Sequence, residues 1–386
     1  MSPWLAAARA VGIEIAARHA DDVDLRARFP AEAVAELRKR KLLSIMVPES
    51  EGGPGAGIAE VVSVCHELGQ HCASTAMIYA MHQIQVSCLV RHAGTNTWQL
   101  SFRKRLVDDQ LLLASATSEA GVGGDVRSSV CALDERRGRF MLVKQAPVIS
   151  YGEESDAILV TARRTPQSPA SDQVIVVVPR AGVELHPQES WDTLGMRGTC
   201  SKGYRLAAEG EMAQVIPAPY ADVSAHTMLP TSHLVWSALW LGIATAALAR
   251  ARAFVRGEAR KRPGLPPPGS GRLAETMSEL QSMKSNLVAC LRRYEAAIGS
   301  EDRLSALPFA VAMNNLKLDS SQSAVKIVDQ AMLICGLAGY RNDSPFSVGR
   351  HLRDAHSAVV MVNNDRIVAN NANLGLALRE EPELLA

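Results

Sequence analysis

The stretch from Gly336 to Ala355 holds residues whose types and spacing could frame a binding site. Its two glycines, Gly336 and Gly339, are expected at a helix C-terminus, because glycine adopts a left-handed backbone at little cost. Ser344-Pro345 predicts the start of the next helix, with serine as the N-cap and proline in the first turn. Arg350 and Asp354 follow on one helical face. A glycine turn that leads into fixed charged side chains predicts part of a ligand site.

The composition excludes several classes of partner. The chain has 386 residues, of which 47% are hydrophobic, so a large core is expected. A net charge of +1 argues against nucleic acid, and 4% aromatic residues offer few platforms for stacking bases. The 7 cysteines are scattered without a CxxC pair, which predicts reduced thiols in a cytoplasmic protein and no metal site. We expect no signal peptide, and no membrane span because polar residues and glycine interrupt the most apolar run.

Three segments of different periodicity must position these residues. Residues 1–110 show helical periodicity, and 217–386 contain long helical patterns separated by a proline-rich loop. Residues 111–216 are β-rich, with short strands expected at 112–117, 128–133, 140–144, 157–161, 174–178 and 203–206. We therefore predict an α+β fold that is mainly α: an N-terminal helical domain, a middle β-barrel or sandwich, and a C-terminal four-helix bundle.

Five short motifs occur in one order along these segments. They are Val47–Gly53, Thr117–Asp125, Val148–Ser150, Leu194–Thr199 and Gly336–Ala355. In this order, and in these domains, they resemble the motifs of the acyl-CoA dehydrogenase superfamily of flavoproteins. Each motif alone is weak, because ordinary turn chemistry explains it equally well. The ordered set favours the resemblance.

The resemblance implies FAD, bound between the β-domain and the C-terminal helical domain. On the β-domain it implies contacts from Ser115, Thr117 and Ser118, whose hydroxyl and amide groups suit the polar edge of an isoalloxazine ring. Ile149 and Ser150 would flank the same ring from a neighbouring strand. In the family, further contacts come from a neighbouring subunit, here implied as Arg262, Gly336 and Gly339. A homodimer or homotetramer is expected for the same reason.

The family's catalytic carboxylate is absent from both of its usual positions. One position, counted from Arg353-Asp-Ala355, is occupied by Val362, and the other corresponds to Ser232. A glutamate there removes the α-proton of an acyl thioester in the family. A different base would then be needed, and His233, His82 and Asp365 are the polar candidates nearest the implied pocket. Each of them could equally be a hydrogen-bonded structural residue.

Three functional hypotheses follow from these departures. The first is FAD-dependent α,β-dehydrogenation of an acyl-CoA or carrier-bound acyl thioester, with an electron-transfer partner or oxygen as the acceptor. The alternative is a flavin-dependent monooxygenase of the same fold, which needs no α-proton base. The third is a homologue that binds without catalysis, because the loop after Arg262 lacks the family's Phe and Gln and Leu333 replaces another Gln.

Overall fold

Helices form the N-terminal part of the chain. The computed structural model describes residues 1–261 and 263–378. Its first helices are α1 (Pro3–Val11), α2 (Ala17–Arg26), α3 (Ala31–Lys39), α4 (Ile58–Gly69), α5 (Ala73–His92) and α6 (Thr97–Asp108). A π-helical turn, Gly12–Ala16, joins α1 to α2. Among these helices α5 is buried nearly all round, which explains why its sequence lacks a polar face.

Two β-sheets make up the middle of the chain. The first has the order β1-β4-β5, from strands β1 (Leu113–Ala116), β4 (Ala157–Arg163) and β5 (Gln173–Pro179). The second has the order β2-β3-β7-β6, from strands β2 (Asp134–Arg136), β3 (Arg139–Ile149), β6 (Val183–Glu189) and β7 (Lys202–Glu211). Strand β1 runs parallel to β4, and the other pairs are antiparallel.

The three-stranded sheet is buried on both faces. Leu159 and Val177 pack into one apolar cluster together with side chains of α5 and α6. Ile158 and Val176, on the opposite face, join the main core with Leu142 of the four-stranded sheet. Strands buried on both faces therefore read as continuous apolar runs, whereas β3 alternates buried and exposed residues.

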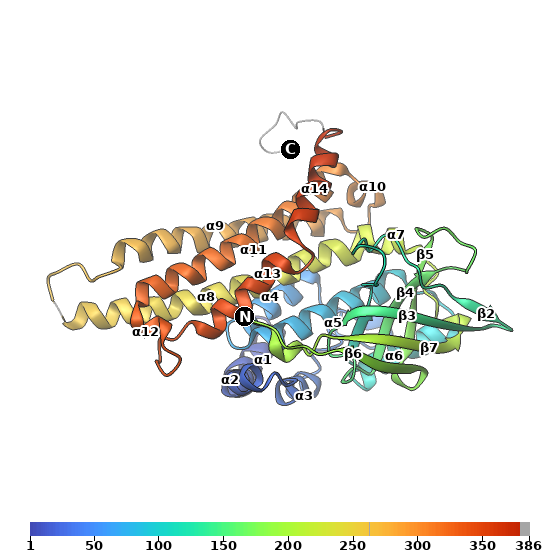
Figure 1. Cartoon of the computed structure of the whole chain (residues 1–386), viewed down its shortest axis with the longest axis horizontal. Coiled ribbons are helices and arrows are strands. Elements are labelled where there is room, and N and C mark those ends of the chain that lie inside the picture. Colours follow the sequence, from blue (N-terminus) through green and yellow to red (C-terminus); the bar gives the residue numbers. More distant parts are fainter. Residues whose placement is uncertain (262, 379–386) are drawn as a thin grey trace.

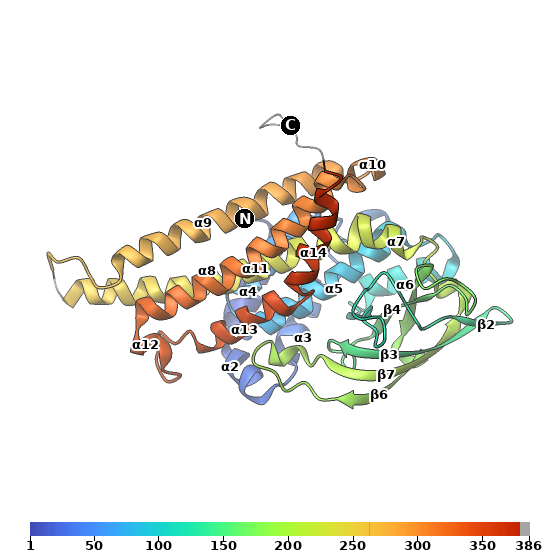
Figure 2. The ribbon, with the colours of Figure 1, turned by 45° about the horizontal axis from the view of Figure 1, so that its top comes forward.

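Long helices follow the β-domain. They are α7 (Tyr220–Val223), α8 (Leu229–Lys261), α9 (Ser270–Ala297), α10 (Glu301–Leu304), α11 (Leu307–Cys335), α12 (Leu337–Tyr340), α13 (Gly349–Val360) and α14 (Asn364–Gly375). Helices α8, α9 and α11 lie side by side and extend away from the β-domain, which occupies one end of the molecule (Figure 1; Figure 2). Helix α8 packs against α4, α5, α9 and α11. The predicted mainly α fold with a middle β-domain and a C-terminal helical bundle is confirmed.

One continuous helical segment is long and apolar enough to cross a membrane. It comprises Tyr220–Lys261, and 83% of its most apolar window is buried inside the fold. Its neighbours on several sides are protein helices, so it has the environment of a core helix.

Some local predictions were wrong. Residues 128–133 form no strand beyond one isolated bridge at Ala132, because Glu119 binds the backbone amides of Val130 and Cys131. Helix α13 begins at Gly349 rather than at Ser344-Pro345, since the Ser344 hydroxyl accepts only from the Phe346 N–H in a local turn. Gly336 does end α11, whereas Gly339 lies inside α12.

Two of the sequence motifs meet where the β-domain contacts α13. The Met196 N–H donates a 2.8 Å hydrogen bond to Oδ1 of the buried Asp354. Arg353 pairs with Asp24 of α2. Gly195 approaches the α13 backbone so closely that a Cβ there would lie 2.1 Å from the Arg353 carbonyl oxygen. These contacts set the position of the β-domain relative to the helical domain.

Gly195→Ala should weaken this contact, because a backbone carbonyl cannot move aside as a flexible side chain can. We expect a loss of about 1–3 kcal/mol in the free energy of unfolding. Gly257→Ala is the matched control: it lies in α8 with no atom within 4 Å of a new Cβ. That substitution should stabilise by about 0.5–1 kcal/mol. Denaturant unfolding measures both, and equal midpoints for the two variants would contradict the docking role of Gly195.

Candidate functional site

Hydroxyl groups gather where strands β1 and β3 end. Ser115 and Thr117 are half-buried, and within the described residues neither hydroxyl has a hydrogen-bond partner. The Ser118 hydroxyl donates to the Val148 carbonyl at 3.1 Å, which ties the end of β1 to β3. Ser150 lies on the same strand end, 2.7 Å from the Ser201 hydroxyl. The structure thus brings together four of the predicted cofactor residues.

A β-bulge decides which side chains of β3 face outward at this point. The register with β7 shifts between Ala146 and Ile149, so that Pro147 and Val148 are both exposed. The Val148 side chain is 41% exposed, whereas the Ile149 side chain is fully buried. Ile149 can therefore meet a ligand only through its backbone, and Val148 presents the side chain. We call Ser115, Thr117, Ser118, Val148 and Ser150 the candidate cofactor face.

A buried ion pair holds the segment after β1 in place. Glu119 accepts hydrogen bonds from the Ser129 hydroxyl at 2.6 Å, from the Cys131 N–H at 2.6 Å and from Lys144 Nζ at 3.2 Å. Lys144 also donates to the Thr161 carbonyl at 2.8 Å. Burial would raise the pKa of Glu119, but the Ser129 hydrogen bond and the Lys144 charge lower it below its usual value. The carboxylate is thus ionised and saturated with donors.

The start of α14 contacts the loop that follows β1. Arg366 donates to the Gly123 carbonyl, and its guanidinium fills the space that a Cβ of Gly124 would need. Val362 has φ +50 and is 51% exposed. A β-branched residue rarely adopts this left-handed backbone, so the turn at Val362 is strained.

His82 has both ring nitrogens engaged. Its Nδ1 accepts from the Leu113 N–H at 3.0 Å, so Nε2 carries the proton and donates to the Leu43 carbonyl at 2.7 Å. Complete burial lowers the pKa of His82 to about 4. While these bonds persist the ring has no free lone pair, and it holds β1 through Leu113.

Within the described residues, only the Nδ1 nitrogen of His233 has a hydrogen-bond partner. Its Nδ1 lies 2.9 Å from the Met313 carbonyl and must donate, which leaves the lone pair on Nε2. Burial, helped by the charge of Lys317, lowers the pKa of His233 to about 4 although the hydrogen bond to Met313 opposes the shift, so the ring is neutral at physiological pH. Lys317 in turn donates to the Ala358 carbonyl at 3.1 Å and to Asn364 Oδ1 at 2.5 Å. Through Lys317 the environment of His233 is connected to the segment that contains Val362.

The remaining predicted residues differ in their surroundings. Asp365 is exposed at the start of α14, where its N–H donates to Asn363 Oδ1 at 2.9 Å. Gly336 is exposed with φ +56, and no atom lies within 4 Å of the Cβ position, so a ligand could approach its backbone. Gly339 is buried against Cys335. Arg262 lies outside the described residues.

Three residues with defined roles were missed by the sequence interpretation. Lys317 lies on the buried face of α11 at helical spacing from Met313 and Ser321, so its periodicity could have revealed it. Lys144 occupies an inward position of an alternating strand. Arg366 carries no such pattern, because its contact with Gly123 is made only in the tertiary fold.

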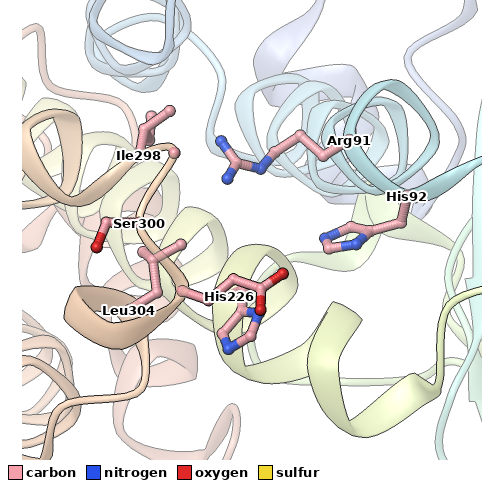
Figure 3. A pocket seen from close by; sticks show the side chains of 8 residues that line it. Arg91, His92, His226, Ile298, Ser300 and Leu304 are labelled. Carbon is pink, nitrogen blue, oxygen red and sulfur yellow. The ribbon is translucent and has the colours of Figure 1, made fainter.

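One described cavity lies apart from these residues. It has a volume of about 360 Å³ and lies between the C-terminal end of α5 and the turn before α10. Arg91 and His92 reach into it from α5, with His226, Ile298, Ser300 and Leu304 on the facing wall (Figure 3). None of the predicted site residues lines this cavity.

Asp354 is a buried carboxylate that is connected to the candidate cofactor face through the turn at Met196. Burial raises the pKa of Asp354 to about 6, although Arg350 and the hydrogen bond from Met196 oppose this shift. The Met196 carbonyl accepts from Thr199 at 2.9 Å, and Thr199 lies 2.8 Å from Ser201, the partner of Ser150. Asp354 therefore supports one end of a hydrogen-bonded chain that reaches Ser150.

Two family models match the sequence. The model described as "Acyl-CoA dehydrogenase, N-terminal domain" matches residues 4–109. The model described as "Acyl-CoA dehydrogenase, C-terminal domain" matches residues 224–361. A mitochondrial isovaleryl-CoA dehydrogenase from Solanum tuberosum is 25% identical over 352 residues, which cover 88% of this chain and 81% of the relative.

Solved structures share the fold over nearly the whole chain. Butyryl-CoA dehydrogenase from Megasphaera elsdenii has a TM-score of 0.80 at 20% identity, with 97% of each chain covered. Dibenzothiophene monooxygenase from Paenibacillus sp. A11-2 has a TM-score of 0.82 at 19% identity, with 99% of each chain covered. At these identities the likeness shows the fold alone.

Asp354→Asn should change how stability depends on pH. Asparagine keeps an acceptor for the Met196 N–H but cannot ionise. Because the pKa of Asp354 is about 6 in the native state and about 3.9 in the unfolded chain, the natural protein loses stability from this group as pH rises towards and through 6. The variant should gain about 2–3 kcal/mol relative to the natural chain between about pH 4 and about pH 7. Urea unfolding across this range tests it, and a constant difference between the two proteins would refute it.

Proposed function

We propose a function from the premise that the chain belongs to the acyl-CoA dehydrogenase family, whose members bind FAD. The proposed activity is FAD-dependent α,β-dehydrogenation of an acyl thioester carried by coenzyme A or by a carrier protein. The reaction removes a proton from the α-carbon and a hydride from the β-carbon, and a double bond forms between them. Bound FAD would supply the acceptor for the hydride.

The candidate cofactor face supports the choice of FAD. Ser115 and Thr117 offer hydroxyl groups that have no partner within the described residues, and Ser118 and Ser150 add polar atoms beside them. This donor and acceptor set suits the polar edge of an isoalloxazine ring. The exposed Val148 side chain would cover part of the ring's apolar surface. Gly336 offers an open backbone to the distant half of the cofactor, at a surface that a second subunit could share.

His233 is the base that the geometry supports best among the three candidates. Its Nε2 keeps a free lone pair because Nδ1 donates to Met313, and this is the observation that carries the assignment. His82 uses both nitrogens, and Asp365 is exposed to solvent. Lys317 supports this proposal because it bonds to Ala358 and Asn364, on either side of Val362, and so holds that segment near His233.

The alternative function is a flavin-dependent monooxygenase. Two observations favour keeping it: neither Val362 nor Ser232 supplies a carboxylate, and the fold matches a dibenzothiophene monooxygenase. That reaction transfers one oxygen atom of O₂ to the substrate and reduces the other to water with electrons from reduced flavin. It requires no base for an α-proton.

The proposed partners follow from the same premise. An electron-transfer protein or oxygen would reoxidise the flavin, and we place the protein in the cytoplasm. Leu333, Leu337 and Tyr340 form an exposed apolar surface at the end of α11 and on α12, with exposed fractions of 54%, 71% and 71%. Such a surface beside Gly336 favours a homodimer or homotetramer in which it is covered.

An anaerobic titration with acyl-CoA distinguishes the hypotheses. The purified protein should be yellow with bound FAD, and short-chain or branched acyl-CoA should bleach the flavin absorbance. Absence of flavin after reconstitution would favour the non-catalytic homologue. Bound flavin that acyl thioesters leave unchanged, combined with oxygen transfer by the reduced protein, would establish the monooxygenase and exclude dehydrogenation.

Substitution of His233 tests the assigned base. His233→Ala should slow flavin bleaching about 100-fold or more, the usual contribution of a general base. His356→Ala is the control, because His356 is exposed on α13 and outside the proposed site. Urea unfolding and flavin content of both variants separate lost chemistry from lost folding. A folded, flavin-loaded His233→Ala protein that bleaches at the natural rate would remove His233 from the mechanism.

A further inference from the structure

An arginine interrupts the apolar course of α8. Arg250 donates from Nη1 to the Ala246 carbonyl of its own helix at 3.2 Å, and the described residues provide it with no ion pair. Partial burial lowers the pKa of the Arg250 guanidinium and the nearby Arg350 lowers it further, whereas the charge of Asp21 opposes the shift. Arg250 is only half-buried, so a guanidinium that lacks an ion pair within the described residues keeps N–H donors available to an anion from solution.

Arg250 lines a cavity of about 350 Å³ with an apolar wall. The cavity lies between the end of α4, the middle of α8 and the segment before α13. Ala246, Ala249 and Ala253 share a helical face with Arg250 and contribute only methyl groups. Phe346 covers the opposite wall. Its ring packs edge-on against the ring of Phe254, with 5.4 Å between the ring centroids. Gln70, His71 and Pro345 complete the lining.

The acids near this cavity are already engaged or exposed. Arg350 binds the His71 carbonyl at 3.3 Å and Asp21 at 3.1 Å, but the Asp21 side chain is 85% exposed. On the α4 wall, Glu67 is held by Arg9 through two bonds of 3.0 and 3.1 Å. His351, next to Arg350, is 6% exposed, and its Nδ1 has no partner in the described chain. Of the cations Arg9, Arg250 and Arg350, only Arg250 therefore lacks an ion pair within the described residues.

We propose that this cavity binds an organic anion, with a carboxylate or phosphate group on Arg250 and an apolar body against the alanines and Phe346. The planar guanidinium matches the two oxygens of a carboxylate or phosphate. The small alanine side chains leave room for the body, and the cavity volume suits a compact ligand. This proposal stands apart from the dehydrogenation reaction, because none of its lining residues belongs to the candidate cofactor face or to the base candidates.

Calorimetric titration of the full-length protein with chosen probes tests the site. The probes are benzoate, hexanoate and inorganic phosphate, and benzamide serves as the uncharged match for benzoate. Benzoate or hexanoate should bind at least about tenfold more tightly than benzamide, since benzamide cannot pair with the guanidinium. Binding of phosphate alone would refute the apolar part of the proposal. No binding of any probe at about ten millimolar, or equal binding of benzoate and benzamide, would refute the whole.

Two matched variants place the anion at Arg250. Arg250→Met should weaken organic-anion binding at least about tenfold, whereas Arg252→Met, on the exposed side of the same helix, should leave it unchanged. Without ligand, Arg250→Met should unfold at the same or a higher temperature than the natural protein, because a half-buried cation without an ion pair is replaced by an apolar side chain of similar length. Equal anion affinity in the two variants, or a strongly lowered melting temperature of Arg250→Met, would overturn the assignment.

Discussion

The bond from the Met196 N–H to the buried carboxyl group of Asp354 joins the β-domain to α13, and the rest of the site is arranged around it. The same helix leads into the strained turn at Val362, while the turn that contains Met196 leads to the hydroxyls beside Ser150. A shift of α13 would therefore move the base segment and the cofactor face relative to one another. Close backbone contact at Gly195 leaves little freedom for such a shift.

Three cations, the buried Lys144 and Lys317 and the half-buried Arg250, are compensated in different ways in this molecule. Lys144 has a carboxylate, Glu119, and so fixes the backbone after β1 with a neutral pair. Lys317 has only neutral oxygens from Ala358 and Asn364, and burial lowers its pKa to about 8, so its charge is weakly held. Arg250 has only a carbonyl of its own helix. The charge of Lys144 is thus neutralised within the chain, whereas the charge of Arg250 would be neutralised by the anion that we propose to bind there.

Much of the fold could be predicted because its patterns are local. The helix Leu307–Cys335 keeps its buried residues on one face, and Ala73–His92 is a long run without Gly or Pro. The buried strands β4 and β5 are continuous apolar runs. The segment 128–133 looked like a strand but is held by Glu119, a contact that no periodicity reveals. Similarly, a bulge in β3 turns the Val148 side chain outward and leaves the Ile149 side chain buried, the reverse of what the sequence interpretation assigned to Ile149. Which histidine could act as a base depends on hydrogen-bond partners that the sequence does not show. Both nitrogens of His82 are engaged, whereas His233 has a partner within the described residues only at Nδ1.

The hydroxyl chain beneath the cofactor face has a defined direction. Thr199 must give its only hydroxyl proton to the Met196 carbonyl, which can only accept. Ser201 must then donate to Thr199, and Ser150 must donate to Ser201. The outward side of the Ser150 oxygen consequently carries only lone pairs. Whatever ligand lies against this strand end must present an N–H or O–H to Ser150, and a ligand with an acceptor at that point would be repelled.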